Sequence, residues 1–337
     1  PDPDGSSTVP HAIPPPSGEL RIGFDIGGTH FRAAVVDSGG RIVDRLQKSS
    51  NGTAEALEDG IVEAVHEVLA RFPRVTGVGL AVAGFLDPER RRVRFAPHLP
   101  WRDADVARRL GERLPIPVTL EHDANSAAWG EYRYGAAQGA GTWVLFALGT
   151  GIGGALMHGG EIYRGAYGTA PEFGHLTMVR GGRPCSCGKR GCLERYCSGT
   201  ALAATARELA TTGRYEGPLA RACTVGKATG IDVMHAAQAG DPLARAAVAD
   251  VADWLGRSLA LVADVFDPEL IVIGGGVAQA ADQYLERARS VFAEELTGAG
   301  HRPLARIEVA RLGADAGIIG AADLAGANPE GKVSVRE

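Results

Sequence analysis

The chain lacks the features that would point to membranes or nucleic acids. No apolar run in its 337 residues is long enough to cross a bilayer. Its formal net charge is only −5, and this weak negative balance argues against a nucleic-acid surface and gives no sign of attraction to membranes. We therefore expect no nucleic acid and no membrane among its partners.

Cysteine is scarce, and signals for export are missing. The five cysteines are an odd number, which does not fit a disulfide framework. Residues 1–18 contain several prolines and no apolar stretch of the signal-peptide kind, so they predict a disordered leader. Residues 328–337 predict a frayed tail. These features favour a cytoplasmic protein.

Glycine, in contrast, is abundant. The 47 glycines indicate many tight turns and close backbone approaches. Only 6% of the residues are aromatic while 45% are hydrophobic, which is ordinary for an enzyme rich in small residues. A length of 337 residues is long for one compact core and suits two α/β lobes.

The first part of the chain predicts strands and helices arranged around a glycine turn. Residues 22–26 and 31–37 predict strands on either side of Gly27-Gly28-Thr29, and residues 41–48 predict a third strand after a hairpin turn. Helical spacing of apolar residues predicts a helix over 53–72. The remaining elements expected here are a buried strand over 75–83, a helix over 101–114, a strand over 117–121 and a helix that runs to Tyr134.

The same order of elements then returns, which predicts an internal duplication. Strands are expected over 144–148, 155–158 and 161–163, and a glycine turn over 149–154 separates the first two. When Phe24 is aligned with Phe146, Gly27 falls on Gly149. Beyond these elements the sequence predicts mostly helices to Val265, a strand over 270–273 before Gly274-Gly275-Gly276, and further helices that include a last one over 314–325.

Two strand–glycine–strand turns in one chain suggest a clamp for phosphate. If they face each other across a cleft, their backbone N–H groups point at the same anion. Thr29 and Thr150 would add hydroxyl donors, and Asp25 at the end of the first strand is a natural partner for hydrated Mg²⁺. Gly274 to Gly276, between a strand and a helix, could lie near a base or ribose. The alternative for each glycine set alone is an ordinary turn.

A rival motif is present but lacks its context. Gly149, Gly151 and Gly154 satisfy the dinucleotide-binding spacing, which requires a helix directly afterwards. Here a hairpin is expected, so dinucleotide binding is disfavoured. The chain contains no G-x-x-x-x-G-K-[ST] segment and is therefore not a P-loop enzyme.

A tight group of cysteines and one histidine predicts a zinc site. His175, Cys185, Cys187 and Cys192 fall within eighteen positions, and three thiolates with one imidazole form a closed tetrahedral set. A closed site braces a loop instead of activating water, so Glu172 and Glu194, which bracket the cluster, would be held stiffly as substrate-orienting groups. The alternative is three unrelated cysteines in a glycine-rich loop.

Asp123 ends a predicted strand and starts a predicted helix, where active residues of open α/β sheets tend to lie. The helix N-terminus favours its anionic form, and such a carboxylate could take the proton from an attacking hydroxyl in phosphoryl transfer. The alternative is that Asp123 only caps the helix.

These segments together resemble the ROK family of sugar kinases and repressors, most closely its ATP-dependent glucokinases, over residues 20–325. The resemblance is carried by Asp25-Ile-Gly-Gly-Thr29, Glu121-His-Asp-Ala-Asn125, Leu148-Gly-Thr-Gly-Ile-Gly-Gly154, Glu172-Phe-Gly-His175 and Cys185-x-Cys-Gly-x-x-Gly-Cys-x-Glu194.

The resemblance implies an α/β fold of two lobes, of the actin-like ATPase (ribonuclease H-like) type, with a structural zinc loop. The small lobe would comprise residues 19–122 with the last helix, about 314–327, and the large lobe residues 123–313 with the zinc loop at 175–194. The implied activity is ATP-dependent phosphorylation of a hexose, glucose above all, in a homodimer or homotetramer.

The resemblance also implies roles for individual residues. Asp123 would be the general base, and His175 would both bind zinc and approach the sugar. The sugar site would comprise Gly84, His98, His122, Asp123, Glu172, His175 and Glu194, and zinc would be bound by His175, Cys185, Cys187 and Cys192. ATP and Mg²⁺ would be bound by Asp25, Gly27, Gly28, Thr29, Gly149, Thr150, Gly151, Gly153, Gly154, Gly275 and Gly276.

Two positions depart from the family pattern. The family usually has Asn where this chain has His122, and often has Asn where this chain has His98. An imidazole offers one hydrogen bond per nitrogen where an amide offers a fork, so another hexose could be preferred, such as N-acetylmannosamine, mannose, fructose or allose, or affinity could become sensitive to pH near neutrality. The phosphoryl donor, ATP or polyphosphate, stays open. A sugar-responsive regulator is the other alternative, disfavoured because the Pro-rich residues before Asp25 offer no recognition helix.

Overall fold

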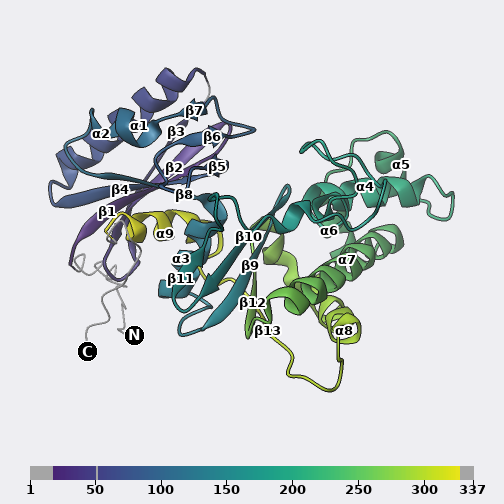
Figure 1. The fold of residues 1–337 in the computed structure, drawn as a ribbon. Coiled ribbons are helices and arrows are strands. Elements are labelled where there is room, and N and C mark those ends of the chain that lie inside the picture. The colour runs from purple at the N-terminus through teal and green to yellow at the C-terminus, as the bar shows by residue number, and fades with distance from the viewer. Residues whose placement is uncertain (1–17, 51, 327–337) are drawn as a thin grey trace, which may run out of the picture.

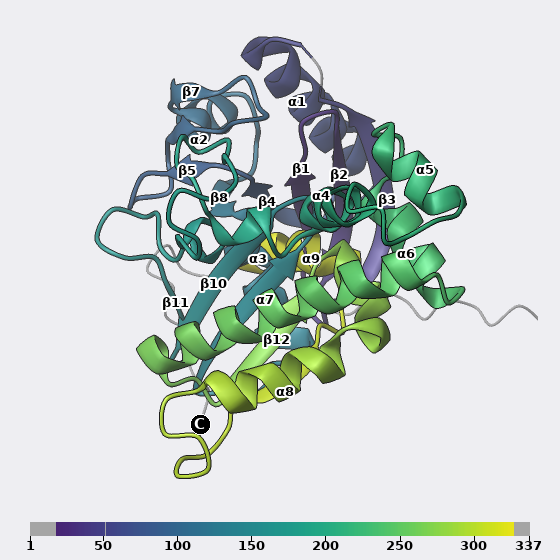
Figure 2. The ribbon, with the colours of Figure 1, turned by 90° about the vertical axis from the view of Figure 1, so that its right-hand side faces the viewer.

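The computed structural model describes residues 18–50 and 52–326, which form two lobes side by side (Figure 1). The expected leader, apart from Gly18, and the tail at 328–337 lie outside the described residues. Viewed from the side, the long helices of the second lobe cover one face of its sheet (Figure 2). No helix among the described residues is long and apolar enough to span a membrane.

The first lobe is built on a five-stranded sheet. Its strands are β1 (Leu20–Ile26), β2 (His30–Asp37), β3 (Ile42–Ser49), β4 (Val75–Val82) and β8 (Val118–His122), in the order β3-β2-β1-β4-β8. The β1–β2 hairpin is antiparallel, whereas β4 pairs in parallel with both β1 and β8. Helix α1 (Ala54–Arg71) begins after Thr53, whose side chain accepts from the N–H of Ala56, and buries its apolar stripe in the same core as these strands.

The helix expected over 101–114 is present, but it is much shorter than predicted. Residues Arg102–Ala104 form strand β7, and helix α2 covers only Val106–Gly111. The buried Trp101 side chain donates to Glu58 in α1, and the Asp105 side chain caps the helix at the N–H of Arg108, so the helix cannot start earlier. With β5 (Phe85–Leu86) and β6 (Val93–Phe95), β7 forms a small sheet that the sequence did not reveal.

The second lobe repeats the first sheet, which confirms the predicted duplication. Its strands run in the order β11-β10-β9-β12-β13 with the same antiparallel and parallel pairings. The strands are β9 (Thr142–Leu148), β10 (Ile152–His158), β11 (Glu161–Tyr163), β12 (Leu270–Gly274) and β13 (Arg306–Val309). The short edge strand β13 was not expected. Because Gly149 leads into a strand and not a helix, the dinucleotide-binding interpretation is excluded here.

Helices cover one face of the second sheet and share one large core with it. They are α4 (Gly199–Ala210), α5 (Pro218–Thr224), α6 (Gly230–Gln238), α7 (Pro242–Phe266) and α8 (Leu285–Glu295), with 3₁₀ helices η1 (Phe173–His175), η2 (Leu193–Arg195), η3 (Gly276–Gln283) and η4 (Gly313–Asp315). Helix α7 starts at a capping Asp241 followed by Pro242 at the first helical position, and ends where Asp267 adopts a left-handed conformation.

Two crossing helices join the lobes. Helix α3 (Asp123–Tyr134) follows β8 of the first sheet but packs on β10 of the second, while α9 (Ala316–Leu324) follows β13 but packs on β1 and β4. The two helices pack against each other near the middle of the molecule (Figure 1). A Cβ at Gly320 would lie only 1.7 Å from the carbonyl oxygen of Ser126, so this crossing requires glycine.

Candidate functional site

A small pocket lies where the lobes meet. One wall comes from the first lobe and from the start of α3, and the other comes from the loop that follows β11. The lining residues are Gly84, Phe85, His122, Asn125, Gly168, Thr169, Ala170, Pro171 and Glu172. Two predicted sugar-binding residues from the first lobe, Gly84 and His122, therefore face a third, Glu172, from the second.

Asp123 occupies the first position of α3, directly after β8. His122 holds the N-cap position without a side-chain cap bond, so Asp123 is not the cap itself. One oxygen of Asp123 accepts from the N–H of Ala124 at 2.7 Å and lies 3.2 Å from Nε2 of His122. The side chain is 41% exposed, which leaves the carboxylate free to meet a substrate hydroxyl.

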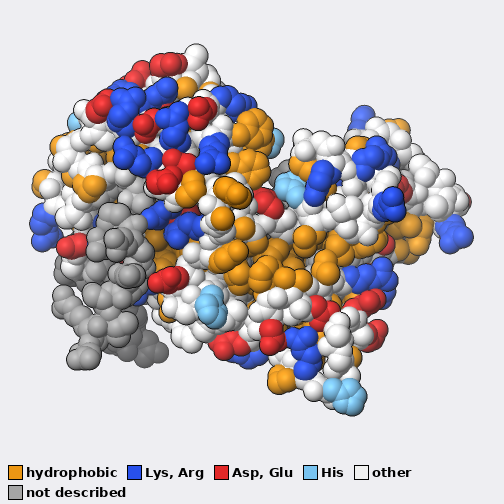
Figure 3. Space-filling view, in the orientation of Figure 1, with side chains coloured by type: hydrophobic (Ala, Val, Ile, Leu, Met, Phe, Trp, Pro, Cys, Tyr) orange, Lys and Arg blue, Asp and Glu red, His pale blue; other side chains and the backbone are white. Residues whose placement is uncertain are grey.

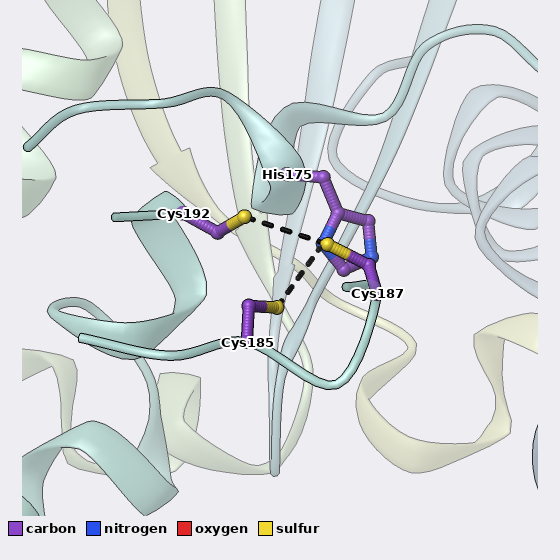
Figure 4. Close-up of side chains that lie close together, drawn as sticks. All are labelled: His175, Cys185, Cys187 and Cys192. Carbon is purple, nitrogen blue, oxygen red and sulfur yellow. Dashed lines mark hydrogen bonds between the residues drawn. The ribbon is translucent and has the colours of Figure 1, made fainter. Parts of the chain in front are cut away.

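The predicted metal ligands come together, as Figure 4 shows. The ligand atoms of His175, Cys185, Cys187 and Cys192 all lie within 4.8 Å of one another. The sulfurs of Cys187 and Cys192 are 3.6 Å apart, and Cys185 Sγ is 3.7 Å from His175 Nδ1. Zinc–sulfur bonds of about 2.3 Å in a tetrahedron place ligand atoms about 3.7 Å apart, so these residues fit a zinc ion.

The chemistry of the sulfurs is consistent with this fit. Burial raises the pKa of the Cys185 thiol to about 12. A bound cation would be required to hold this sulfur as a thiolate at neutral pH, and zinc does this to the thiols it binds. Cys197 and Cys223 lie outside the cluster and are buried free thiols.

His175 lies between the cysteine cluster and the acidic side chains of the pocket. Its Nδ1 faces Cys185, while its Nε2 lies 4.0 Å from Glu172, so one nitrogen serves the cluster and the other points to the pocket side. Glu194 lies 3.9 Å from His175 Nδ1 and accepts from the Cys185 thiol at 3.1 Å. Burial raises the pKa of the Glu172 carboxyl above its ordinary value, and the neighbouring His122 and His175 oppose that rise.

Both glycine turns leave backbone donors available. Among the described residues, no hydrogen bond is made by the N–H groups of Gly28 and Thr29 in the first turn, or of Thr150 and Gly151 in the second. Buried or clustered donors of this kind favour an anion. The first turn also carries charge, because Asp25 forms an ion pair with Arg32 across the β1–β2 hairpin. Arg32 was not expected in the site; the observed register of the hairpin places it opposite Asp25.

The glycines of the second turn differ in which atoms lie close to the place that a Cβ would occupy. A Cβ at Gly151 would lie 2.5 Å from an oxygen of Glu194, so the zinc loop reaches this turn. Gly153 and Gly154 lie within β10, where the Phe173 ring fills the space in front of Gly154. Gly275, with φ of +81°, packs against the backbone of Leu148, and the adjoining Gly276 starts η3.

Other residues at the turns extend this picture. His98 lies against the first turn, because a Cβ at Gly28 would be 3.1 Å from the His98 carbonyl oxygen. It does not line the pocket, in contrast to His122. At the second turn the N–H of Gly199, the first residue of α4, donates to the carbonyl of Gly149 at 2.8 Å. The sequence offered no signal for Gly199, because the contact joins segments far apart in the chain.

The residue before the His122-Asp123 pair is a buried acid that was not singled out in advance. Glu121 is 2% exposed and forms ion pairs with Arg164 at 2.6 Å and Arg90 at 3.4 Å. Burial alone would raise the pKa of Glu121, but the two arginines overcome this and lower it, so the carboxylate stays charged.

The duplicated sheets, the pocket at their junction and the zinc-type cluster beside it define a two-lobed α/β protein of the kind that the sugar kinases represent. Residues 21–328 match the model of the ROK family, and the chain belongs to that family. It is 39% identical to a glucokinase of Streptomyces coelicolor over 91% of the chain and 97% of that relative.

Solved structures agree. A ROK family glucokinase from Streptomyces griseus, in complex with glucose and AMPPNP, matches with a TM-score of 0.79 and 40% identity over 91% of this chain and 99% of that one. The ROK hexokinase of Thermus thermophilus matches with a TM-score of 0.75 and 35% identity over 91% of this chain and 97% of that one. The two-lobed ROK sugar kinase fold expected from the sequence is thus confirmed.

Proposed function

We propose that this chain transfers the γ-phosphoryl group of ATP to a hexose, with glucose as the principal substrate and glucose 6-phosphate as the product. The observation that carries the proposal is the pocket between the lobes, which His122 and Glu172 line from opposite walls, with the accessible carboxylate of Asp123 3.2 Å from the His122 ring. The likeness to glucokinases at 39% identity and to a glucokinase with bound glucose and AMPPNP supports the choice of donor and acceptor.

In this mechanism Asp123 accepts the proton of the sugar hydroxyl as its oxygen attacks the γ-phosphorus. A new P–O bond forms, the bond from the γ-phosphorus to the bridging oxygen breaks, and ADP leaves with that electron pair. The free N–H groups of Gly28, Thr29, Thr150 and Gly151 would bind the phosphates. Mg²⁺, which enters with ATP, would neutralise phosphate charge on the side of Asp25, where Arg32 already supplies one cation.

Zinc has a structural role in this proposal. His175, Cys185, Cys187 and Cys192 would hold it with no open position, so its chemistry is limited to fixing ligands. The fixed loop orients Glu172, His175 and Glu194 toward sugar hydroxyls. Glu194, which also touches Gly151, then lies between the sugar and the second phosphate turn.

We also propose that the protein is oligomeric and cytoplasmic. A band of hydrophobic side chains crosses the junction of the lobes on the face shown in Figure 3. Leu261 and Val265, one turn apart on α7, are 41% and 65% exposed. Such exposed apolar groups suit the homodimer or homotetramer expected for the family, and the use of ATP suits the cytoplasm.

The test is a coupled assay of ADP release with saturating MgATP and a panel of hexoses. We expect glucose-dependent release that exceeds release without sugar by orders of magnitude, with phosphate on the 6-hydroxyl of the product. Absence of release with glucose, N-acetylmannosamine, mannose, fructose and allose would contradict the proposal, whereas release with one of the others would correct only the sugar.

A further inference from the structure

The buried acid Glu121 lies where the two walls of the pocket are joined. It is the last residue but one of β8 and immediately precedes His122 and Asp123. Its ion-pair partner Arg164 directly follows β11 in the second lobe, and Arg90 comes from the turn between β5 and β6. The cluster therefore ties together segments of both lobes within one turn of the expected base.

The two oxygens of Glu121 have separate partners. Oε2 accepts from Nε and Nη2 of Arg164, at 3.0 and 2.6 Å, and from Nη1 of Arg90 at 3.4 Å. Oε1 accepts from the backbone N–H of His122 and from Nδ2 of Asn125, each at 3.0 Å. One oxygen is thus bound to cations that come from outside β8, while the other fixes the backbone and side chain on either side of Asp123.

Arg164 also sets the position of the opposite wall. The loop from Arg164 to Glu172 lines the pocket, and the N–H of Ala170 donates to the Arg164 carbonyl at 3.2 Å. Midway along this loop Gly168, with φ of +78°, lies so close to the first lobe that a Cβ would be 3.1 Å from the carbonyl oxygens of Leu86 and Asp87. The loop is therefore bonded to the first lobe at Arg164 and lies close against it at Gly168.

From these contacts we propose that Glu121 and Arg164 form a clasp that sets the spacing between the Asp123 wall and the Glu172 wall, and so act as positioning residues for the sugar. The clasp rests on the proposed function, because it assigns a task within the same pocket. A buried ion pair adds little stability over apolar packing, whereas its charge-assisted hydrogen bonds fix direction and distance. Misplacement of reacting groups by about 1 Å lowers the rate by up to about a hundredfold. The clasp would therefore affect the reaction through the spacing between the two walls.

The test compares Arg164→Met, Arg164→Lys, Glu121→Gln and the double variant Glu121→Gln/Arg164→Met. The matched control is Arg302→Met, because Arg302 has a similar exposure, 26% against 23%, and also forms an ion pair, with Asp264 at 3.2 Å. We expect Arg164→Met to raise the hexose KM at least about tenfold while the KM for MgATP stays within about twofold. Arg164→Lys keeps the charge without the fork and recovers part of the loss.

The double variant tests whether the two residues act through each other. We expect its hexose KM to be no higher than that of the worse single variant. Effects that multiply would overturn the clasp, and so would an Arg164→Met protein that melts at a lower temperature but keeps the hexose KM of the parent. The control Arg302→Met should keep the hexose KM of the parent even if its melting temperature falls.

Amide hydrogen exchange separates this inference from the proposed function. Arg164→Met is expected to speed exchange in residues 165–172 and to leave 185–192 at the parent rate. If the parent phosphorylates no hexose, the proposed function fails and the exchange result still decides the clasp. Unchanged exchange in 165–172 overturns the clasp even in an active kinase.

Discussion

The two sheets of this protein share one strand order and differ in where their acidic side chains come from. In the first lobe, Asp25 is the last residue but one of β1, Glu121 is the last residue but one of β8, and Asp123 directly follows β8. At the matching position of the second lobe β9 has Ala147, and no acid occurs from Val309 to Leu312 after β13. The acids of the second lobe, Glu172 and Glu194, lie instead on the segment inserted between β11 and α4.

This difference shows two ways of holding a carboxylate still. Strand ends are fixed by the backbone bonds of the sheet, and in the first lobe the buried Glu121 adds hydrogen bonds on either side of Asp123. The inserted segment has short 3₁₀ turns and isolated bridges in place of a continuous ladder. Its rigidity would have to come from the four metal ligands, so the two lobes should respond very differently to mutation and to loss of the metal.

The largest expected effect is at Asp123, the proposed base, which the first lobe holds in place. Asp123→Asn removes the proton acceptor and leaves an isosteric amide, so kcat should fall by roughly 10² to 10⁴. The KM values should change little if the group acts mainly in the transition state. Steady-state assays of the purified variant measure both.

The control for that experiment is Asp232→Asn. Asp232 is also an acid in the first turn of a helix, where it forms a capping box in α6. Its loss should lower the melting temperature slightly, because the capping box loses one of its two hydrogen bonds, with no change in kcat. An Asp123→Asn enzyme that turns over as fast as the parent would remove the central element of the mechanism.

The second prediction concerns the segment inserted between β11 and α4, which carries Glu172 and Glu194. Cys192→Ser should release the ion and loosen Glu172 and Glu194, raising the hexose KM roughly 10- to 100-fold, while Asp123→Asn should keep its metal. Elemental analysis of the parent should find zinc at about one ion per chain. Cys223→Ser, at a buried cysteine outside the cluster, should keep both zinc and KM.

Zinc-free protein with an unaltered hexose KM would contradict the contrast between the lobes. It would mean that the inserted segment is held by its protein contacts alone, such as the bond from Lys189 Nζ to the His175 carbonyl at 2.6 Å.

A smaller effect is expected where the insertion meets the second turn. Gly151→Ala puts a Cβ 2.5 Å from an oxygen of Glu194, and this flexible carboxylate must move away. A displacement worth about 1 kcal/mol corresponds to roughly a fivefold rise in the hexose KM. Gly111→Ala at the end of α2, where a Cβ meets no atom within 4 Å, should leave the KM unchanged. Equal KM values for both variants would show that Glu194 does not act from this position.

The sequence predicted the parts of the molecule that have strong local patterns. The alternating strands of both blocks, α1 and the return of the glycine turn are all present, because burial on a sheet demands such patterns. The cysteine spacing predicted the cluster for a similar reason, since its ligands lie close along the chain. Short edge strands such as β13 carry too few residues for a pattern.

Contacts between distant segments could not be predicted in this way. Glu121 and Arg164 meet across the two lobes, and nothing in the order of residues links them. The helix expected from Trp101 is shorter because a buried indole bonded to Glu58 and a capping Asp105 decide the local structure. The Glu121–Arg164 and Trp101–Glu58 contacts are tertiary, whereas the Asp105 cap is a local signal that the sequence itself contains.

The smallest expected effect concerns which sugar is chosen. His122→Asn exchanges a ring whose Nε2 lies 3.2 Å from Asp123 for a shorter amide fork. The ratio of kcat/KM for glucose to that for mannose or N-acetylmannosamine should change by roughly 2- to 4-fold. His98→Asn, at the first glycine turn, should change it less, because His98 does not line the pocket. His66→Asn on the exposed side of α1 is the control.

The outcome assigns sugar selection to one lobe or to both. A changed ratio in His122→Asn means that the first lobe contributes to specificity through the residue beside its base. If neither His122→Asn nor His98→Asn changes the ratio, these positions do not determine which sugar is preferred. Selection would then rest on Glu172, His175 and Glu194, so that the first lobe supplies the chemistry and the inserted segment of the second lobe supplies the specificity.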